Sequence, residues 1–275
     1  MTRIKLIATD LDGTLLDDQK RIPEENLAAL KEAYENGILV ALASGRMLSN
    51  VERTEALLGL DCILIAYNGG KVAGPRSSGR PLLIHRPLPA DVAQVFVEFS
   101  HETGLLLNFY DDEILFAEDG GDRRRFMELY TRRTGVPYQI VGDLRREFAG
   151  VSPTKLIVLA DPPEAARVVE TLRARVGDRA CISRSEPEYV EITAPGVDKG
   201  AILGPVASQF GVSIEEVMAL GDADNDITML RAAGLGVALA NAPERVRAEA
   251  DRVTDRTNNE AGAAEAIRRW ALHST

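Results

Sequence analysis

The sequence predicts an α/β protein with a Rossmann-like core, in which a doubly wound parallel sheet is interrupted by an inserted α+β unit. Three observations support this fold class. Continuous apolar segments alternate with amphipathic helical segments at both ends of the chain, a pattern typical of a parallel sheet covered on both faces. In the middle of the chain this alternation gives way to a different order of elements. The first apolar segment runs directly into a pair of aspartates.

The N-terminal part is expected to alternate strand and helix. Its strands are short apolar runs, and Gly37 ends the first helix because glycine readily leaves the helical conformation. The expected strands cover residues 4–9, 38–43 and 62–66, and the expected helices cover 23–36 and 48–58.

The middle part reads as an α+β unit of ordinary domain size. It follows a hairpin expected over residues 72–86, whose turn is rich in glycine, proline and serine. Helices are expected over 91–103, 122–134 and 163–176, and strands over 105–109, 114–117, 154–160, 180–183 and 189–193.

After residue 194 the first alternation returns, so the two ends of the chain should form one domain. We expect a core domain of residues 1–86 and 194–275 and an inserted domain of residues 87–193. The returning elements are a helix that begins at Lys199, a strand over 217–220, a helix over 224–232, a strand over 236–239 and a helix over 259–271.

Composition excludes several classes of protein. The 275 residues carry a formal net charge of −10, which argues against non-specific binding to nucleic acid. No apolar run approaches the ~18 residues of a membrane span, and the N-terminus lacks a signal-peptide pattern, so a cytoplasmic location is expected. Cys62 and Cys181 lie in apolar segments and are expected to be buried, reduced thiols. The sequence leaves the oligomeric state open.

The segment Asp10-Leu11-Asp12-Gly13-Thr14 is the strongest functional signal. Alternate side chains of a strand share one side, so Asp10 and Asp12 can both face the crevice at the carboxyl end of the sheet, where α/β proteins bind ligands. Two acids there can hold a cation such as Mg²⁺, or divide the roles of nucleophile and proton carrier. The alternative is a turn in which both aspartates cap the next segment.

Two further polar segments end strands of the expected sheet. Ser44 and Gly45 end the second strand, where a hydroxyl and backbone N–H groups can bind an anion, or where Ser44 simply caps the next helix. Asn68-Gly69-Gly70 ends the third strand. It is either a plain turn or a polar side chain at the same edge of the sheet.

The C-terminal part adds a lysine and a second acidic segment. Lys199 is either a solvated surface residue or a cation that neutralises phosphoryl oxygens. Asp222 ends the strand over 217–220, and Asn225 and Asp226 follow three and four residues later, which returns them to the same side of a helical turn. One acid can then bind a metal while the other orients it from behind, or the segment is an acidic helix start.

Taken together, these residues resemble the haloacid dehalogenase (HAD) superfamily, and the Cof-type, type IIB branch in particular. Asp10 to Thr14 is similar to its first motif, Ser44 to the second, Lys199 to the third, and Gly221-Asp222 through Asn225-Asp226 to the fourth. The similarity covers nearly the whole chain. It implies a HAD-like core and identifies the inserted unit as an α/β cap domain.

The resemblance implies a Mg²⁺-dependent phosphatase that hydrolyses small phosphorylated metabolites, with sugar phosphates as the expected substrates. Asp10 would attack phosphorus and form an aspartyl-phosphate, and Asp12 would act as general acid and base. An oxygen of Asp10, the backbone carbonyl of Asp12 and Asp222 would hold Mg²⁺, with Asp226 behind them. The residues implied in binding the phosphoryl group are Leu11, Ser44, Gly45, Lys199 and Asn225.

Three alternatives can be stated. A phosphomutase on the same scaffold would return the phosphoryl group to a bound sugar. A receiver-like module with a phosphorylatable aspartate would not turn over, but it needs neither a large insertion nor the second acid Asp12. A serine hydrolase is disfavoured because His85, His101 and His273 follow no nucleophile-elbow pattern. These histidines are expected to be surface or packing residues.

Overall fold

Eight strands form the main sheet, in the order β14-β13-β12-β1-β2-β3-β4-β5. A computed structural model describes residues 3–272. Neighbouring strands from β14 to β3 are parallel, and β4 pairs with β3 in the antiparallel direction. The strands are β1 (Leu6–Asp10), β2 (Leu39–Ala43), β3 (Ile63–Ala66), β4 (Lys71–Ala73), β5 (Leu82–His85), β12 (Val217–Gly221), β13 (Leu235–Ala238) and β14 (Arg252–Val253).

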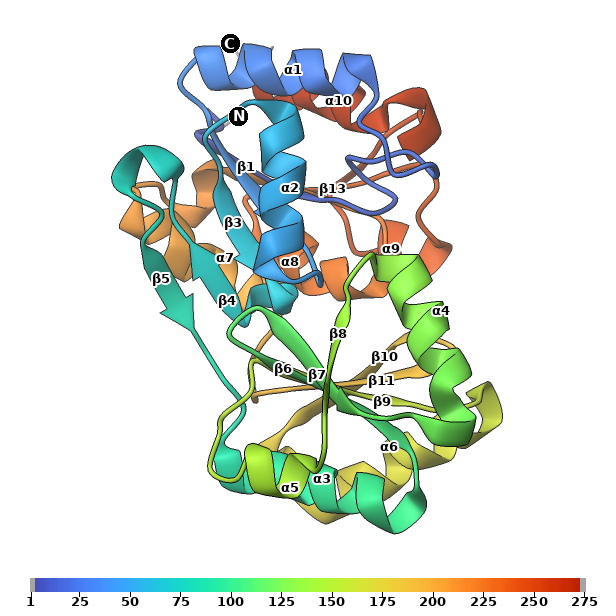
Figure 1. The fold of residues 1–275 in the computed structure, drawn as a ribbon. Coiled ribbons are helices and arrows are strands. Elements are labelled where there is room, and N and C mark those ends of the chain that lie inside the picture. The colour runs from blue at the N-terminus through green and yellow to red at the C-terminus, as the bar shows by residue number, and fades with distance from the viewer. Residues whose placement is uncertain (1–2, 273–275) are drawn as a thin grey trace. The chain divides into compact units, whose positions relative to one another are not determined.

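Helices cover both faces of this sheet. The α7 helix (Lys199–Gln209) and the α8 helix (Ile227–Ala232) pack on the face that carries Leu6 and Ala8. The alternate residue Ile7 belongs to the opposite face and is also fully buried. The remaining helices of this part are α1 (Glu24–Glu35), α2 (Leu48–Leu58), α9 (Glu244–Arg247) and α10 (Gly262–Ala266), with α1 packed against α10 (Figure 1). The expected doubly wound, largely parallel core is therefore confirmed.

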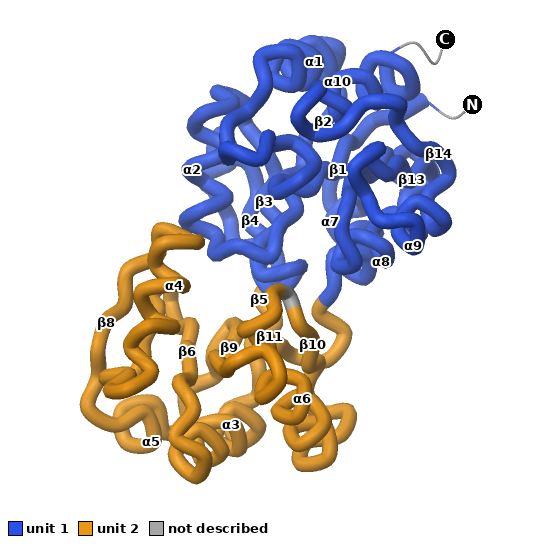
Figure 2. Tube along the Cα trace, turned by 90° about the vertical axis from the view of Figure 1, so that its right-hand side faces the viewer, with its two compact units in different colours: residues 1–84, 198–275 blue, residues 85–197 orange. Residues whose placement is uncertain are grey.

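The chain divides into two compact units (Figure 2). Unit 1 contains the described residues up to 84 and from 198 onward, and unit 2 contains residues 85–197. Unit 2 has its own six-stranded sheet, in the order β10-β11-β9-β6-β7-β8. All its neighbouring strands are antiparallel except β7 and β8.

Helices lie on both faces of the second sheet. The face that carries Leu107 and Val158 is covered by apolar residues of α3 (Ala90–Thr103) and α6 (Pro162–Val176), and α4 (Arg124–Thr134) lies on the other side (Figure 1). The short helix α5 covers Leu144–Glu147. The strands are β6 (Leu106–Asp111), β7 (Ile114–Glu118), β8 (Tyr138–Val141), β9 (Lys155–Leu159), β10 (Cys181–Glu186) and β11 (Tyr189–Thr193).

Several local expectations need correction. Strands β8 and β14 and helices α5 and α9 were not expected, because each is too short to show a period. The last helix begins at Gly262 rather than at 259 and continues as a π-helical segment, Ile267–Leu272. Cys62 is buried as expected, but Cys181 is exposed because it begins an edge strand of the second sheet. Within residues 3–272, no helix combines the length and apolar character that a membrane crossing requires.

Candidate active site

Four loops meet at one edge of the main sheet. They follow β12, β1, β2 and β3, which are neighbours in this order and run parallel. Asp10 is the last residue of β1, Ser44 follows β2, Asn68 follows β3, and Asp222 follows β12. Because the carboxyl ends of parallel strands lie at the same edge, the sheet itself gathers these polar residues.

Lys199 is the buried centre of the site. Its Nζ donates to Asp10 Oδ1 and to Asp226 Oδ1, each at 2.6 Å, and its side chain is fully buried. The interpretation of Lys199 as a solvated surface residue is therefore wrong. Burial lowers the pKa of Lys199, but the charges of Asp10 and Asp226 outweigh burial and raise it overall, so the ammonium stays charged.

Asp10 is buried, with 7% of its side chain exposed, and burial raises the pKa of its carboxyl well above the usual value. The charge of Asp226 acts in the same direction, and Lys199 offsets only part of the rise. Lys199, Asp10 and Asp226 thus form one buried cluster in which each charged group depends on the others.

Asp222 is held from two sides. Thr14 Oγ1 donates to Asp222 Oδ1 at 2.6 Å, and Asn241 Nδ2 lies 3.3 Å from Asp222 Oδ2 and 2.8 Å from the carbonyl oxygen of Gly13. Gly13 has a φ of +83°, and a Cβ there would come within 2.4 Å of Asp222 Oδ2. Glycine is therefore required at this position for two reasons.

The acidic residues provide a set of oxygens suited to a hard cation. Carboxylate oxygens of Asp10, Asp222 and Asp226 lie within 4.8 Å of one another. Both carboxylate oxygens of Asp226 already accept hydrogen bonds. Oδ1 accepts one from Lys199, and Oδ2 accepts those of the backbone N–H groups of Asp222 and Ala223. Burial raises the pKa of Asp222 to about 6, as is expected for a carboxylate placed to meet a cation. These residues fit Mg²⁺, which prefers oxygen ligands.

Asp12 lies in a different environment from Asp10. Arg46 binds it with two hydrogen bonds, from Nε to Oδ2 at 2.7 Å and from Nη2 to Oδ1 at 2.5 Å, and Lys20 Nζ lies 2.6 Å from Oδ1. Burial raises the pKa of Asp12, but Arg46 and Lys20 outweigh burial and lower it overall. The side chain of Asp12 is absent from the group of close carboxylate oxygens in the described residues. The Asp12 carboxylate faces Arg46 and Lys20 instead.

The residues expected to bind phosphate lie in the same loops. Ser44 is buried, and its Oγ accepts the backbone N–H of Arg46 at 3.2 Å. Leu11 is buried, and its carbonyl oxygen accepts the N–H of Leu16 at 2.8 Å. Asn225 is exposed and donates from Nδ2 to Asn68 Oδ1 at 3.1 Å. A Cβ on Gly45 would lie 3.1 Å from that same oxygen.

Sequence reasoning missed several residues of this site. Thr14 lies within the first motif and Arg46 lies beside the second, so the sequence drew attention to both positions. It did not show that Thr14 bonds to Asp222 or that Arg46 bonds to Asp12. Asn241 comes from the loop after β13, where no pattern marks it. Lys20 lies in a polar turn with a φ of +61°, and nothing in that turn indicates that it reaches Asp12.

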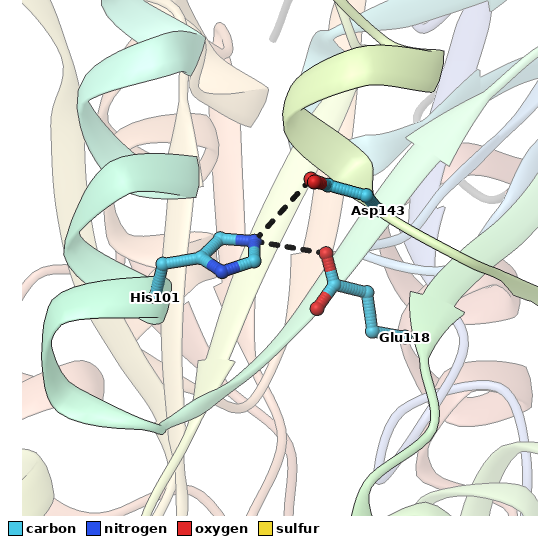
Figure 3. A group of neighbouring side chains, drawn as sticks. All are labelled: His101, Glu118 and Asp143. Atoms are coloured by element: carbon cyan, nitrogen blue, oxygen red, sulfur yellow. Dashed lines mark hydrogen bonds and ion pairs between the residues drawn. The ribbon is translucent and has the colours of Figure 1, made fainter.

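Unit 2 contains the one further group of possible metal ligands among the described residues. His101 Nε2 lies 2.9 Å from Glu118 Oε1 and 3.7 Å from Asp143 Oδ1 (Figure 3). Glu118 Oε1 also accepts the backbone N–H of Leu144 at 2.7 Å, and Asp143 Oδ1 accepts that of Arg145 at 2.9 Å, which caps α5. Hydrogen bonds that join α3, β7 and α5 account for this group, and we assign no metal to it.

The other histidines have local roles or lie outside the structure. His85 Nε2 lies 2.9 Å from Thr154 Oγ1, and both residues belong to unit 2. His273 lies outside the described residues. His101 faces the carboxylates of Glu118 and Asp143, and His85 lies beside the hydroxyl of Thr154.

A buried lysine between acids, at the carboxyl edge of a doubly wound sheet, suits an enzyme that acts on phosphate esters. Comparison with known proteins identifies this class. The chain belongs to the haloacid dehalogenase-like hydrolases, whose family model matches residues 7–267, and it is a phosphatase of the Cof-type, subclass IIB branch. This membership removes the non-catalytic receiver module from consideration.

Relatives and solved structures match almost the whole chain. The 5-amino-6-(5-phospho-D-ribitylamino)uracil phosphatase YcsE of Bacillus subtilis strain 168 is 33% identical over 269 residues, which are 98% of this chain and 96% of that protein. The HMP-PP phosphatase of Escherichia coli O81 (strain ED1a) is 31% identical over 246 residues, 89% of this chain and 87% of that protein. A haloacid dehalogenase-like hydrolase from Bacteroides thetaiotaomicron superposes with a TM-score of 0.88 at 30% identity, covering 97% of this chain and 99% of that chain.

Proposed function

We propose that this protein is a Mg²⁺-dependent phosphatase that hydrolyses small phosphorylated metabolites, sugar phosphates among them, through an aspartyl-phosphate on Asp10. The observation that carries the proposal is the buried Lys199–Asp10 pair at 2.6 Å, with Asp222 in the same group of carboxylates. A carboxylate fixed in this way cannot turn aside, and its position at the end of β1 is set by the sheet.

In the first step, an Asp10 oxygen forms a bond to phosphorus while the bond from phosphorus to the ester oxygen breaks. Asp12 gives its proton to the departing oxygen. In the second step, water attacks phosphorus, Asp12 takes a proton from that water, and the bond from phosphorus to Asp10 breaks. Phosphate leaves, and both aspartates return to their starting forms.

Charge is the main obstacle to this reaction, because a phosphate dianion is repelled by the carboxylates of the site. Mg²⁺, held by Asp10, the Asp12 carbonyl and Asp222, supplies positive charge that offsets this repulsion when it is bound. Lys199 supplies a second fixed charge beside Asp10. The hydroxyl of Ser44, the N–H groups of Leu11 and Gly45, and the amide of Asn225 would bind the equatorial phosphoryl oxygens.

Asp12 can act as an acid only after its present contacts change. Its pKa is lowered by the bonds from Arg46 and Lys20, and a group with a low pKa is a poor proton donor near neutral pH. Transfer to the leaving oxygen therefore requires that Asp12 exchange these bonds for one to the substrate. Arg46 and Lys20 are then free to bind anionic parts of that substrate.

The substrate class rests on the relatives. The name of the Bacillus subtilis relative specifies a phosphorylated ribityl compound, and that of the Escherichia coli relative specifies HMP-PP. Both support a small phosphorylated metabolite for this chain. The phosphoribityl group of the first is a sugar-alcohol phosphate, which supports sugar phosphates as the finer assignment.

The test begins with hydrolysis of p-nitrophenyl phosphate in MgCl₂ and in EDTA. We expect multiple turnovers that require Mg²⁺, and loss of hydrolysis in Asp10→Asn, whose amide cannot carry the phosphoryl group. Asp255→Asn is a matched control, because Asp255 is 85% exposed and contacts Arg269. Near-native turnover by Asp10→Asn would refute the covalent route.

A panel of phosphorylated metabolites then tests the substrate class by kcat/KM. Sugar and sugar-alcohol phosphates should rank above nucleotides and phosphoproteins. A panel in which they rank last contradicts the finer assignment and leaves the phosphatase itself intact. Analysis of the products separates hydrolysis from a mutase, which would return isomerised sugar phosphate instead of inorganic phosphate.

A further inference from the structure

The turn after β3 has an unusual backbone. Tyr67, Asn68 and Gly69 have φ angles of 52°, 55° and 100°, so three consecutive residues adopt positive φ. Asparagine tolerates this region better than most residues, but tyrosine does not. Strained backbone of this kind persists only where the surroundings fix it, and it concentrates at functional sites.

Two backbone hydrogen bonds fix the turn to the loop after β2. The N–H of Tyr67 donates to the carbonyl oxygen of Arg46, and that of Asn68 donates to the carbonyl oxygen of Ser44, each at 2.9 Å. Gly69 faces the start of α7, where a Cβ on it would come within 2.9 Å of the carbonyl oxygen of Asp198. The turn therefore contacts both the loop of Ser44 and the residue before Lys199.

The side chain of Asn68 connects two loops that are expected to bind phosphate. Its Oδ1 accepts from Asn225 Nδ2 at 3.1 Å. Its amide also covers Gly45, since a Cβ on Gly45 would lie 3.1 Å from Asn68 Oδ1 and 3.3 Å from Asn68 Nδ2. A larger residue at either position would separate the loops after β2 and β12.

The contact between the two amides selects one orientation of Asn225. With Nδ2 toward Asn68, one N–H bonds to Asn68 and the second remains to donate elsewhere. As long as Asn68 keeps its Oδ1 toward Asn225, a turned Asn225 amide would bring the two Oδ1 atoms together, and two acceptors repel each other. The turned amide would also present its oxygen, rather than its N–H, to an anion.

We propose that Asn68 is a positioning residue, which holds the Asn225 amide in the orientation that donates to a phosphoryl oxygen. This inference rests on the proposed function, since it assumes that Asn225 binds the phosphoryl group. Asn68 acts through Asn225 and touches no reacting atom. Its effect should therefore appear in binding and should depend on whether Asn225 is present.

A double-mutant cycle tests this dependence. Asn68→Gly removes the amide and keeps a residue that adopts positive φ without strain, so the turn is expected to fold. Asn225→Ala removes the donor itself. Asn36→Gly is the control, because Asn36 ends α1 and its amide bonds only to the carbonyl oxygen of Glu32 among the hydrogen bonds of the described residues.

Three quantities are measured for each variant with p-nitrophenyl phosphate: KM, kcat and the inhibition constant of inorganic phosphate. We expect KM and the inhibition constant to rise about fivefold in Asn68→Gly and in Asn225→Ala, the size of one neutral hydrogen bond. In the double variant they should rise no further than in Asn225→Ala alone. Asn36→Gly should match the unmodified protein.

The outcomes separate this inference from the proposed function. If the unmodified protein hydrolyses no phosphate ester with Mg²⁺, the proposed function fails and the inference falls with it. If hydrolysis is present but the two effects multiply to about 25-fold in the double variant, Asn68 acts independently of Asn225 and the inference is wrong. An Asn68→Gly variant with unchanged KM and inhibition constant overturns it as well.

Discussion

Replacing Lys199 with methionine should destabilise unit 1 far more than the same change at an exposed lysine. Lys199 Nζ donates hydrogen bonds of 2.6 Å to Asp10 and to Asp226. These two residues are 5% and 0% exposed. Methionine has a similar length but no charge, so it leaves two buried carboxylates without their cation. Breaking a buried ion pair in this way typically costs ~3–5 kcal/mol, a large part of the ~5–15 kcal/mol that holds a protein folded.

The pH dependence of this loss can also be worked out. Burial already raises the pKa of Asp10 above that of an unfolded aspartate, and losing the charge of Lys199 raises this pKa further. The folded state then binds protons that the unfolded state releases, so the variant gains stability as the pH falls. The loss of stability caused by Lys199→Met should therefore be larger at pH 8 than at pH 5.

The assay is urea denaturation in EDTA, followed by the fluorescence of Trp270. It is the single tryptophan of the chain, it belongs to unit 1 and it is 8% exposed. Lys20→Met is the matched control, since the Lys20 side chain is 57% exposed in its pair with Asp12 and should lose no more than ~1 kcal/mol. The reasoning is refuted if Lys199→Met loses no more than Lys20→Met at pH 8, or if its loss is the same at pH 5.

Two further predictions concern the metal and the packing of α7. Burial raises the pKa of Asp222 to about 6, so this carboxyl is protonated in the metal-free protein at pH 5. Its ionisation lowers the free energy of unfolding as the pH rises through 6. The rise in melting temperature on adding MgCl₂ should therefore be small at pH 5, full at pH 7.5 and lost in Asp222→Asn; an equal rise at both pH values contradicts this. Gly200→Ala should destabilise the protein by ~1–3 kcal/mol, because its Cβ would come within 2.2 Å of the carbonyl oxygen of Thr228. Gly204→Ala in the same helix is the control, because a Cβ there would meet nothing within 4 Å. This variant should keep the stability of the unmodified protein or gain up to ~1 kcal/mol. Equal urea midpoints for the two variants would show that the contact between position 200 and Thr228 does not limit stability.

The parts of the fold with a long, regular period could be predicted from the sequence. Strand β1 and helix α2 follow from uninterrupted apolar runs and a 3.6-residue period, and the structure places them within two residues of the expected bounds. The short elements could not be predicted in this way. Helix α5 has four residues and begins at the cap of Asp143, so it depends on tertiary contacts and not on its own pattern.

The candidate site, too, could be predicted from the sequence only in part. The sequence shows that Asp10, Ser44 and Asp222 end strands, and the parallel sheet brings such residues to one edge whatever the details. It does not show which side chains pair there. The contact of Lys20 with Asp12 depends on a residue with positive φ in a polar turn, and the bond from Asn241 to Gly13 joins residues 228 positions apart.

The place of β1 in the main sheet has a consequence for synthesis on the ribosome. Its two neighbours are β2, which follows it closely, and β12, which begins at Val217. Residues 85–197 are contiguous and have a core of their own, so this segment can fold as soon as it emerges. The strand that ends in Asp10 must wait with one edge unpaired until about four-fifths of the polypeptide has been made, and during that interval it is the segment most exposed to mispairing and to chaperones.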